Sequence, residues 1–361
     1  MFSLCLCGDK CVSFSLGVDL FSLNNYLYDL PNELIARFPC EPRDASRLLV
    51  VERKTGQMHE MVFHELSDFL QQGDSLVFND SKVLHARLIG SRSTGGKAEV
   101  FLSKRRPEGT WEALVKPGKK LGIGEKVNFG DGFSCEVVEI LPEGLRIVHF
   151  DFKGQFDDAL EQFGQVPLPP YMQREIIPEL DKLRYQTVYA EHTGSVAAPT
   201  AGLHFTDDML KKFKSKGVTQ EKITLHVGLG TFLPVKMEDI REHRMHHESF
   251  TISNETAKNL NQRQENKLQI CVGTTTCRTL ESAATVNGTI QAGSYDTNIF
   301  IHPGYQFKYV KHLLTNFHQP GSSLLMLVSA FASHELIMEA YAKAIKDRFR
   351  FLSYGDAMLI L

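Results

Sequence analysis

Val272-Gly-Thr-Thr-Thr-Cys-Arg278 joins a strand expected at residues 268–272 to a helix expected to begin at Cys277. Two other segments are similarly rich in glycine and small or hydroxylated residues: Leu225-His-Val-Gly-Leu-Gly-Thr231 and Gly194-Ser-Val-Ala-Ala-Pro-Thr-Ala-Gly-Leu-His-Phe-Thr206. In open α/β sheets, ligands lie beyond the carboxyl ends of the strands. Glycine lets a ligand approach the backbone, and threonine hydroxyls and helix N–H groups supply donors. The three segments therefore predict an α/β body with a small-molecule site at one edge of its sheet.

The segment 194–206 holds two glycines, a proline and three alanines, directly before a helix expected at residues 207–216. Thr206 is the expected N-cap of that helix, because its hydroxyl can accept a hydrogen bond from a first-turn N–H group. His204 and Phe205 should then sit on a tight loop beside N–H groups that have no helical partner. The alternative is a turn that only permits close packing.

Residues 74–150 have a different pattern, in which short alternating runs are separated by Gly, Pro and Asp turns. The runs predict strands at residues 75–79, 83–91, 98–103, 110–115, 126–129, 134–140 and 146–150, which is typical of a barrel or sandwich. The expected fold class is α/β, of the multi-domain α+β kind. A discontinuous mixed-sheet α/β catalytic body (21–73 and 151–361) carries an inserted antiparallel β-barrel domain (74–150), and residues 1–20 form an N-terminal tail.

The charge of the chain is unevenly distributed along the sequence. The 361 residues carry a net charge of −3, so no whole-chain field attracts nucleic acid. Residues 81–126, however, hold eleven Lys and Arg against four Glu, a net charge of +7. A basic barrel beside a small-molecule site fits the docking of a phosphate backbone, and a surface that is basic without function is the alternative.

The cysteines and the apolar runs bear on the compartment of the protein. Seven scattered cysteines do not suggest a disulfide framework, and Cys5, Cys7 and Cys11 lack a recognisable fourth metal ligand. No basic region precedes the short apolar stretch at the N-terminus, and the longest apolar run, 324–332, is far shorter than the ~20 residues of a spanning helix. We therefore expect a cytoplasmic protein with no membrane contact.

Two histidine strings lie outside the three junctions. His243-Arg-Met-His-His-Glu248 offers nitrogen and oxygen ligands, but it is a polar segment that leads into a strand expected at residues 249–252, and it has no cysteine partner of a typical zinc site. Proton transfer, RNA contact or a solvated histidine run are therefore favoured over a metal. Thr315-Asn-Phe-His318 precedes an apolar helix, for which Ser322 is the expected cap.

Eleven strings of this sequence, in order from about residue 22 to the end, resemble the S-adenosylmethionine:tRNA ribosyltransferase-isomerase family of queuosine biosynthesis. The strings are Pro42-Arg-Asp-Ala-Ser-Arg47, Phe78-Asn-Asp-Ser-Lys82, Arg184-Tyr-Gln-Thr-Val-Tyr189, the segment 194–206, His226-Val-Gly-Leu-Gly-Thr-Phe-Leu-Pro234, His243-x-x-His246-x-Glu248, Val272-Gly-Thr-Thr, Arg278-x-Leu-Glu-Ser282, Ile301-x-Pro-Gly-Tyr305, Thr315-Asn-Phe-His318 and Tyr354-Gly-Asp356. The departures are few: Gln319, His302 and the pair Ser81-Lys82 differ from the residues expected there.

The resemblance implies a reaction and its partners. A tRNA that carries 7-aminomethyl-7-deazaguanine at the wobble position receives the ribosyl part of S-adenosylmethionine, which is rearranged to an epoxy-cyclopentanediol while adenine and methionine leave. S-adenosylmethionine is thus a ribosyl-donating co-substrate, and no metal is expected. The family also implies a monomer, and an α/β body with an inserted β-barrel.

The reaction suggests roles for residues in the strings. Removal of a proton next to the sulfonium, protonation of adenine and a neutral attacking amine each suit groups that titrate near neutral pH. The expected catalytic residues are His204, His226, His246, Glu248 and His318, with acid and base unassigned. Those expected to bind S-adenosylmethionine are Thr200, Gly202, Phe205, Gly228, Thr231, Thr275, Arg278 and Asn316. Those expected to bind the RNA are Arg47, Asn79, Asp80, Lys82 and Arg87.

Within that set, Arg278 or the turn 273–276 is expected to hold the methionine carboxylate, and Phe205 or Phe317 to stack on adenine. Two alternatives remain open at this point. One is an RNA-binding module without catalysis, and the other is a metal-dependent hydrolase built on residues 243–248.

Overall fold

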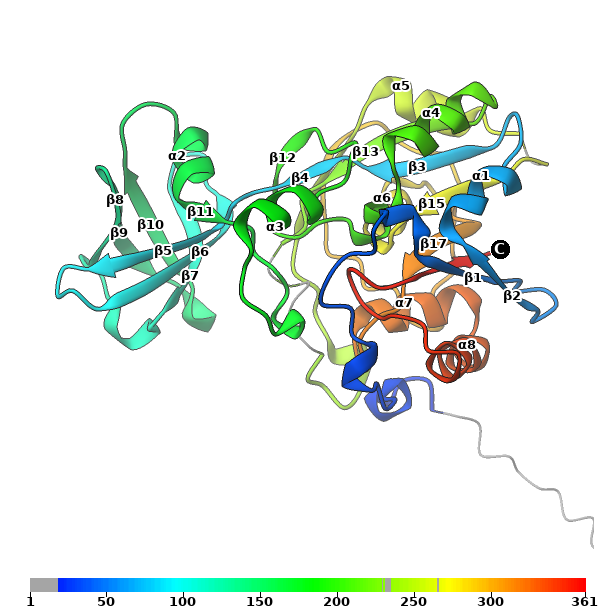
Figure 1. The fold of residues 1–361 in the computed structure, drawn as a ribbon, viewed down its shortest axis with the longest axis horizontal. Helices are drawn as coiled ribbons and strands as arrows, with labels where there is room; N and C mark the ends of the chain where they lie inside the picture. The colour runs from blue at the N-terminus through cyan, green and yellow to red at the C-terminus, as the bar shows by residue number, and fades with distance from the viewer. Residues whose placement is uncertain (1–18, 229, 231–234, 265) are drawn as a thin grey trace, which may run out of the picture.

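A nine-stranded mixed sheet forms the larger part of the structure (Figure 1). The computed structural model describes residues 19–228, 230, 235–264 and 266–361. The strand order is β16 (Gly293–Thr297), β14 (Glu248–Ile252), β13 (Thr219–Leu225), β3 (Ser75–Asn79), β15 (Gln269–Val272), β17 (His312–Asn316), β18 (Ala357–Ile360), β1 (Arg47–Val51) and β2 (Met58–Val62).

The four central strands run parallel. Strand β3 pairs in parallel with β13 on one side and with β15 on the other, and β15 pairs in parallel with β17. Strand β18 is antiparallel to β17 and parallel to β1, whereas β2, β14 and β16 pair antiparallel with their neighbours. The central strands therefore all end at the same edge of the sheet.

Helices cover both faces of this sheet. They are α1 (Leu66–Phe69), α4 (Asp207–Ser215), α5 (Asn254–Asn261), α6 (Thr274–Ala283), α7 (Ser323–Ala332) and α8 (His334–Lys346). Strand residues alternate between the two cores, as in β1, where Leu49 and Val51 join the core beneath α5 to α8, and Leu48 and Val50 join the core beneath α1 and α4. Both predicted caps are confirmed, because Thr206 accepts from the Met209 N–H and Ser322 from the Leu325 N–H.

Short 3-10 helices connect many of these elements. They are η1 (Leu23–Tyr26), η2 (Asn32–Leu34), η3 (Arg43–Ala45), η4 (Phe63–Glu65), η5 (Gly118–Lys120), η6 (Pro142–Gly144), η7 (Pro170–Met172), η8 (Thr200–His204) and η10 (Ile240–Glu242). Within the described part of the chain, no single helix is long and apolar enough to cross a membrane. The pair α7 and α8 passes that test only as a broken span bent by 115°.

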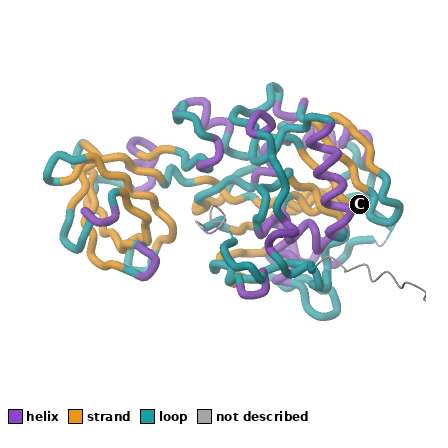
Figure 2. The backbone as a smooth tube through the Cα atoms, turned by 90° about the horizontal axis from the view of Figure 1, so that it is seen from below, coloured by secondary structure: helices purple, strands orange, loops and turns teal. Residues whose placement is uncertain are grey.

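Six strands close into an antiparallel barrel that stands beside the large sheet (Figures 1 and 2). They are β5 (Arg87–Arg92), β6 (Lys97–Arg105), β7 (Trp111–Lys116), β10 (Arg146–Asp151), β9 (Phe133–Ile140) and β8 (Lys126–Gly130), with β8 pairing back to β5. The short strand β11 (Gly164–Gln165) pairs antiparallel with β5. The helix α2 (Phe156–Phe163) packs Phe156 and Leu160 into the barrel core. A two-stranded parallel sheet of β4 (Ser81–Val83) and β12 (His192–Ser195) and the helix α3 (Pro178–Arg184) complete the structure.

The predicted fold class, a mixed-sheet α/β body with an antiparallel barrel, is confirmed. Two expectations on the strands are corrected. The strand expected at 75–79 is the central β3 of the large sheet, so the barrel strands begin only at Arg87. The strand expected at 83–91 is divided between β4 and β5. The domain limits themselves stay a prediction.

Candidate functional site

The three predicted junctions and the string 315–318 meet at the edge where the central strands end. Asn79, the last residue of β3, donates from Nδ2 to the carbonyl of Leu225 in β13 (3.0 Å) and to Oγ1 of Thr275 in α6 (3.4 Å). Gly273, which precedes α6, donates to the carbonyl of Leu314 in β17 (2.8 Å). The ends of β13, β3, β15 and β17 are therefore connected by hydrogen bonds across the edge. Thr231 lies outside the described residues.

The segment 194–204 lies along this same edge. Val196 donates to the carbonyl of Val227 (2.9 Å), and the Val227 N–H donates to Oγ of Ser195 (2.9 Å). At the other end of the segment, Thr200 donates to Oδ1 of Asn316 (3.0 Å) at the end of β17. The sequence thus correctly predicted that these distant segments come together. We call this region the sheet edge site: residues 194–204, 226–228, 273–278 and 316–318.

The start of α6 offers hydrogen-bond donors at the sheet edge site. Gly273 adopts a φ of 91°, a conformation that favours glycine, and it turns the chain from β15 into the helix. Thr276 donates to the Val272 carbonyl at the end of β15 and Thr279 to the Thr275 carbonyl, whereas Thr275 is only partly buried. The first-turn N–H groups have no intrahelical acceptor. Thr275 and these N–H groups can therefore bind polar atoms of a ligand.

His226, an expected catalytic residue, has a half-buried ring beyond the end of β13. Its Nδ1 is enclosed and has no hydrogen-bond partner among the described residues, and no described residue hydrogen-bonds to Nε2, which is the nitrogen that a ligand can reach. Gly194 leaves the space that the ring occupies, since a Cβ there would lie 2.7 Å from Nδ1. Burial lowers the pKa of His226, and His192 lowers this pKa further, while Asp80 opposes the shift. The imidazole is therefore neutral near pH 7 and can accept a proton.

Asp80 was expected to contact RNA, but it is a buried carboxylate beside these histidines. It accepts a hydrogen bond from Thr224 (2.7 Å) and lies 3.8 Å from Nε2 of His192. Burial raises the pKa of Asp80, while Thr224 and His192 act in the opposite direction. Asp80, Glu191 and His192 place ligand-type atoms within 4.8 Å of one another, but the latter two are exposed, and clusters of this kind are common without an ion.

His204 is buried and both of its ring nitrogens are engaged. Asn316 donates to its Nε2 (3.1 Å), so Nδ1 carries the hydrogen and donates to Ser46 (2.7 Å). The ring stacks on Phe63 with 4.8 Å between centroids. Burial lowers the pKa of His204 to about 3, and Arg350 and Arg43 contribute to the shift. This geometry suits a residue that holds η8 against β17 rather than one that transfers protons.

His318 and His246 were also expected to be catalytic, and the structure places them in two different environments. His318 is buried, with its Nε2 2.8 Å from Oγ1 of Thr315, and burial lowers the pKa of His318 to about 3. Its backbone N–H donates to the hydroxyl of Tyr341 (2.8 Å), which fixes the turn after β17. His246 is exposed, and its ring lies against Gly230, where a Cβ would approach within 2.5 Å.

Glu248 and Arg278 form a buried ion pair. Nη1 of Arg278 donates to Oε2 of Glu248, and the exposed fractions of the two side chains are 4% and 5%. Oε1 of Glu248 also accepts from the Gly228 N–H (3.1 Å), while Nε of Arg278 donates to the Ile299 carbonyl (3.3 Å). Glu248 thus ties the end of β13 to α6. This arrangement leaves Nη2 of Arg278 without a partner in the described part of the chain.

Phe205 and Gly202 contribute to packing. Phe205 is fully buried and makes edge contacts with Phe63 and Phe78, with centroids 5.0 Å apart in each case. It therefore has no face open to adenine. Gly202 lies under Tyr189, whose hydroxyl would be 1.9 Å from a Cβ at residue 202. Phe317, the second aromatic residue expected at adenine, is also fully buried.

Substitution of Phe205 by leucine tests this placement. The change should lower the free energy of unfolding by about 1–2 kcal/mol, because a smaller side chain leaves the core underpacked. The affinity for S-adenosylmethionine should stay within about twofold, because the side chain does not reach the edge. Chemical denaturation and equilibrium dialysis measure the two quantities. A tenfold loss of affinity in a protein of unchanged stability would place Phe205 against the nucleoside instead.

Three of the remaining four residues expected to bind RNA have protein partners, and Lys82 lines a hollow. Arg47 donates to Glu60 (2.7 Å) and to the Asp347 carbonyl (2.8 Å), and its guanidinium lies 3.7 Å from the ring centre of Phe349. Arg87 pairs with Glu99 (2.9 Å). Asn79 is buried in the sheet as described above. Lys82 lines a hollow of about 550 Å³, space open to solvent included, between the barrel and the body.

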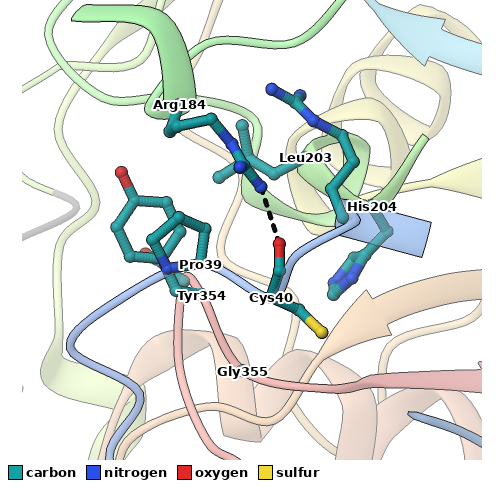
Figure 3. Close-up of a pocket in the computed structure, with 9 residues that line it drawn as sticks. Pro39, Cys40, Arg184, Leu203, His204, Tyr354 and Gly355 are labelled. Atoms are coloured by element: carbon teal, nitrogen blue, oxygen red, sulfur yellow. Dashed lines mark hydrogen bonds between the residues drawn. The ribbon is translucent and has the colours of Figure 1, made fainter. Parts of the chain in front are cut away.

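A second hollow has a volume of about 250 Å³, with the space open to solvent included. Its lining includes Leu203 and His204, together with Arg43, Arg184 and Tyr354, to which no role was assigned from the sequence. Figure 3 shows Arg184 bonded to the Cys40 carbonyl, with Tyr354 on one side of it and His204 on the other. The signal was present in the sequence, since three strings that carry the resemblance begin near Arg43, Arg184 and Tyr354.

Comparisons with known proteins show the family of this chain. The sequence profile of a family described as queuosine biosynthesis protein matches residues 23–360. A protein of Clostridioides difficile (strain 630), named S-adenosylmethionine:tRNA ribosyltransferase-isomerase, is 51% identical over 340 residues, which cover 93% of this chain and 98% of that protein. A relative of the same name from Symbiobacterium thermophilum is 52% identical over 343 residues, with 94% and 99% covered.

A solved structure is similar as well. The crystal structure of S-adenosylmethionine tRNA ribosyltransferase from Thermotoga maritima superposes with a TM-score of 0.53 at 37% sequence identity. The match covers 93% of the present chain and all of the other.

Proposed function

Because the chain belongs to the queuosine biosynthesis protein family, we propose that it is an S-adenosylmethionine:tRNA ribosyltransferase-isomerase. It transfers the ribosyl part of S-adenosylmethionine to a tRNA base and rearranges it, and adenine and methionine are released. The acceptor is 7-aminomethyl-7-deazaguanine at the wobble position. The observation that carries the proposal is the gathering of residues 194–204, 226–228, 273–278 and 316–318 at one edge of the sheet.

His226 acts as the proton acceptor in this proposal. The sulfonium makes the hydrogens on the adjacent C5′ acidic, and a neutral imidazole is suited to remove one of them. Among the histidines expected to be catalytic, His204 and His318 are buried and hydrogen-bonded in the core, whereas the ring of His226 is half-buried at the edge and its Nε2 has no hydrogen-bond partner among the described residues. The carboxylate of Asp80 stabilises the imidazolium when it forms, since Asp80 raises the pKa of His226.

The donors at the start of α6 fit the polar parts of the nucleoside. Thr275 is only partly buried, the first-turn N–H groups have no intrahelical acceptor, and Nη2 of the buried Arg278 has no hydrogen-bond partner among the described residues. Hydroxyls of a ribose can accept hydrogen bonds from such groups. Glu248 acts as a positioning residue in this scheme, because it holds Arg278 and the Gly228 N–H.

The net positive charge of the barrel is smaller than the charge of residues 81–126 suggested. Residues 87–151 hold eleven Lys and Arg but also nine Asp and Glu, a net charge of +2. The register places several cations at one end, which we call the basic end: Arg92, Lys97, Lys116, Lys119, Lys120 and Lys126. Figure 1 shows the β5–β6 hairpin of this end pointing away from the large sheet. This end is the proposed contact for the tRNA backbone.

The double substitution Lys119→Ala and Lys120→Ala tests the basic end. Both lysines are exposed and have no carboxylate within 4 Å in the described part of the structure. We expect tRNA binding to weaken about 5- to 30-fold and the salt slope of log K to fall by about 1–2, because each phosphate contact releases about one counterion. The affinity for S-adenosylmethionine should not change. Filter binding at several salt concentrations measures both effects, and an unchanged slope would remove the basic end from the interface.

The alternatives are less well supported. A pure RNA-binding module does not require the donors and the histidine at the edge of the large sheet, and relatives of about 50% identity are named as enzymes. A hydrolase metal at residues 243–248 would compete with Arg278 for Glu248.

We also propose that the enzyme acts as a monomer, without a metal, in the cytoplasm where its tRNA is found. Activity that survives a strong chelator, and a single-protomer mass in solution, are the expected results.

Nucleoside analysis tests the proposed function. The protein is incubated with S-adenosylmethionine and a tRNA that carries the 7-aminomethyl-7-deazaguanine base. The expected products are a wobble nucleoside with an epoxy-cyclopentanediol substituent, and adenine and methionine in equal amounts. A folded protein that binds both substrates without forming this nucleoside would contradict the proposal.

A further inference from the structure

The hollow beside His204 contains buried polar atoms without partners. We call it the arginine hollow, and define it by Arg43, Arg184 and Tyr354. The hydroxyl of Tyr354 and Nε of Arg184 have no hydrogen-bond partner in the described part of the chain, and the exposed fractions of these residues are 3% and 9%. A buried donor that remains unpaired costs about 1–3 kcal/mol. A ligand atom that accepts from these groups would remove that cost.

The arginine hollow also has positive charge that is not fully compensated. Arg184 pairs with Glu41 and with the Cys40 carbonyl (2.7 Å). Arg43 donates only to the Gln186 carbonyl (3.1 Å), and no carboxylate lies within 4 Å of its guanidinium among the residues that the structure describes.

The charged form of Arg43 is only partly stabilised, because no carboxylate of the described residues pairs with it. Burial lowers the pKa of Arg43, while Tyr354, Asp207 and Asp44 act in the opposite direction. Such a guanidinium is suited to a planar anion with two acceptor oxygens.

The arginine hollow adjoins the sheet edge site. Leu203 and His204 line it, and both belong to η8. Two residues of η8 reach Asn316 at the end of β17: Thr200 donates to its Oδ1, and His204 accepts from its Nδ2. One short helix therefore contributes residues both to the arginine hollow and to the contact with the strand ends.

We propose that the arginine hollow receives the carboxylate of the methionine part of S-adenosylmethionine, with Arg43 as the charged donor and the Tyr354 hydroxyl as a second donor. This inference rests on the proposed function. Arg278, which the sequence favoured for this carboxylate, is already neutralised by the buried Glu248. A second carboxylate beside Glu248 would be repelled, whereas the arginine hollow has no such acid within 4 Å of Arg43 in the described structure.

Equilibrium binding of two ligands to the full-length protein tests the proposal without measuring turnover. The ligands are S-adenosylmethionine and its decarboxylated analogue, and the variants are Arg43→Gln and Tyr354→Phe. The wild-type protein should bind the decarboxylated analogue about 10- to 100-fold more weakly, because it loses a charge-assisted contact. Arg43→Gln should bind S-adenosylmethionine weaker by the same factor, and bind both ligands with nearly equal affinity. Tyr354→Phe should lose about two- to tenfold for S-adenosylmethionine alone.

The controls separate this inference from loss of fold and from the proposed function. Arg348→Gln removes an exposed arginine outside the hollow and should leave both affinities unchanged. Thermal unfolding without ligand shows whether Arg43→Gln is folded. If Arg43→Gln weakens both ligands equally, or neither, the carboxylate is held elsewhere. If it weakens only tRNA binding, the hollow holds an RNA phosphate and the proposal is wrong. In each case, nucleoside formation by the wild-type protein still decides the proposed function separately.

Discussion

Substitution of His226 by alanine should slow adenine release from S-adenosylmethionine about 10²- to 10⁴-fold, which is the usual contribution of a general base. The imidazole is half-buried at the end of β13; its Nδ1 is enclosed, and no described residue hydrogen-bonds to its Nε2. Because its pKa is lowered by burial, the base is in its active, neutral form at pH 7. The affinity for S-adenosylmethionine should change by less than about threefold, because the ring transfers a proton and contributes little to the free energy of binding.

The pH profile distinguishes a base from a structural histidine. For the wild-type protein, kcat/KM should rise with pH up to a pKa below the ordinary histidine value of about 6.5 and then stay level. The variant His226→Ala should lose this rising limb. His59→Ala, which removes an exposed histidine on β2, should keep both rate and profile. A slow His226→Ala variant with an unchanged rising limb would assign the base to another group.

Substitution of Glu248 by alanine should lower the free energy of unfolding by about 3–5 kcal/mol, because it leaves the buried Arg278 without its counter-ion. The Gly228 N–H also loses its acceptor. Arg278→Ala should cost a similar amount for the same reason. The loss of stability in the double variant should be smaller than the sum of the two single losses by about 1–3 kcal/mol. Each single variant leaves one buried charge without a counter-ion, whereas the double variant leaves none.

Glu248→Gln separates a positioning role from a catalytic one. Glutamine can still accept from the Gly228 N–H but does not neutralise Arg278, so we expect a destabilised protein whose residual folded fraction keeps activity. Denaturant unfolding and single-turnover rates at low temperature measure the two properties. A variant with wild-type stability and no activity would instead show that Glu248 reacts with the substrate.

Much of the fold follows from local chemistry that is visible in the sequence. Gly273 and the threonines after it favour a turn from a buried strand into a helix, and Thr206 favours the start of α4 because its hydroxyl caps the first turn. Junctions of this kind gather at one edge because the strands before them are parallel. The barrel is predicted by its short alternating strands. The placement of β3 was missed, because a strand that opens a β-rich region looks like a member of it until its pairing partners are known.

The roles of individual histidines were harder to predict. His204, His226 and His318 occur in similar strings, yet His204 and His318 are buried in the core with hydrogen-bonded rings, whereas the ring of His226 is half-buried at the sheet edge. The difference depends on partners that are distant in sequence, such as Ser46 and Asn316 around His204. Sequence spacing does not show such partners. The same reason explains why Phe205 was expected at adenine, since its burial arises from contacts with η4 and β3.

Photolabelling with an S-adenosylmethionine derivative that carries an azide on adenine tests the location of the site most directly. After irradiation and proteolysis, the label is located by mass spectrometry, with excess unlabelled S-adenosylmethionine as the competition control. The predicted result is competed labelling of peptides that contain residues 194–204, 226–228 or 273–278, at the carboxyl ends of β13 and β15. Competed labelling confined to the barrel strands, residues 87–151, would contradict the sheet edge site.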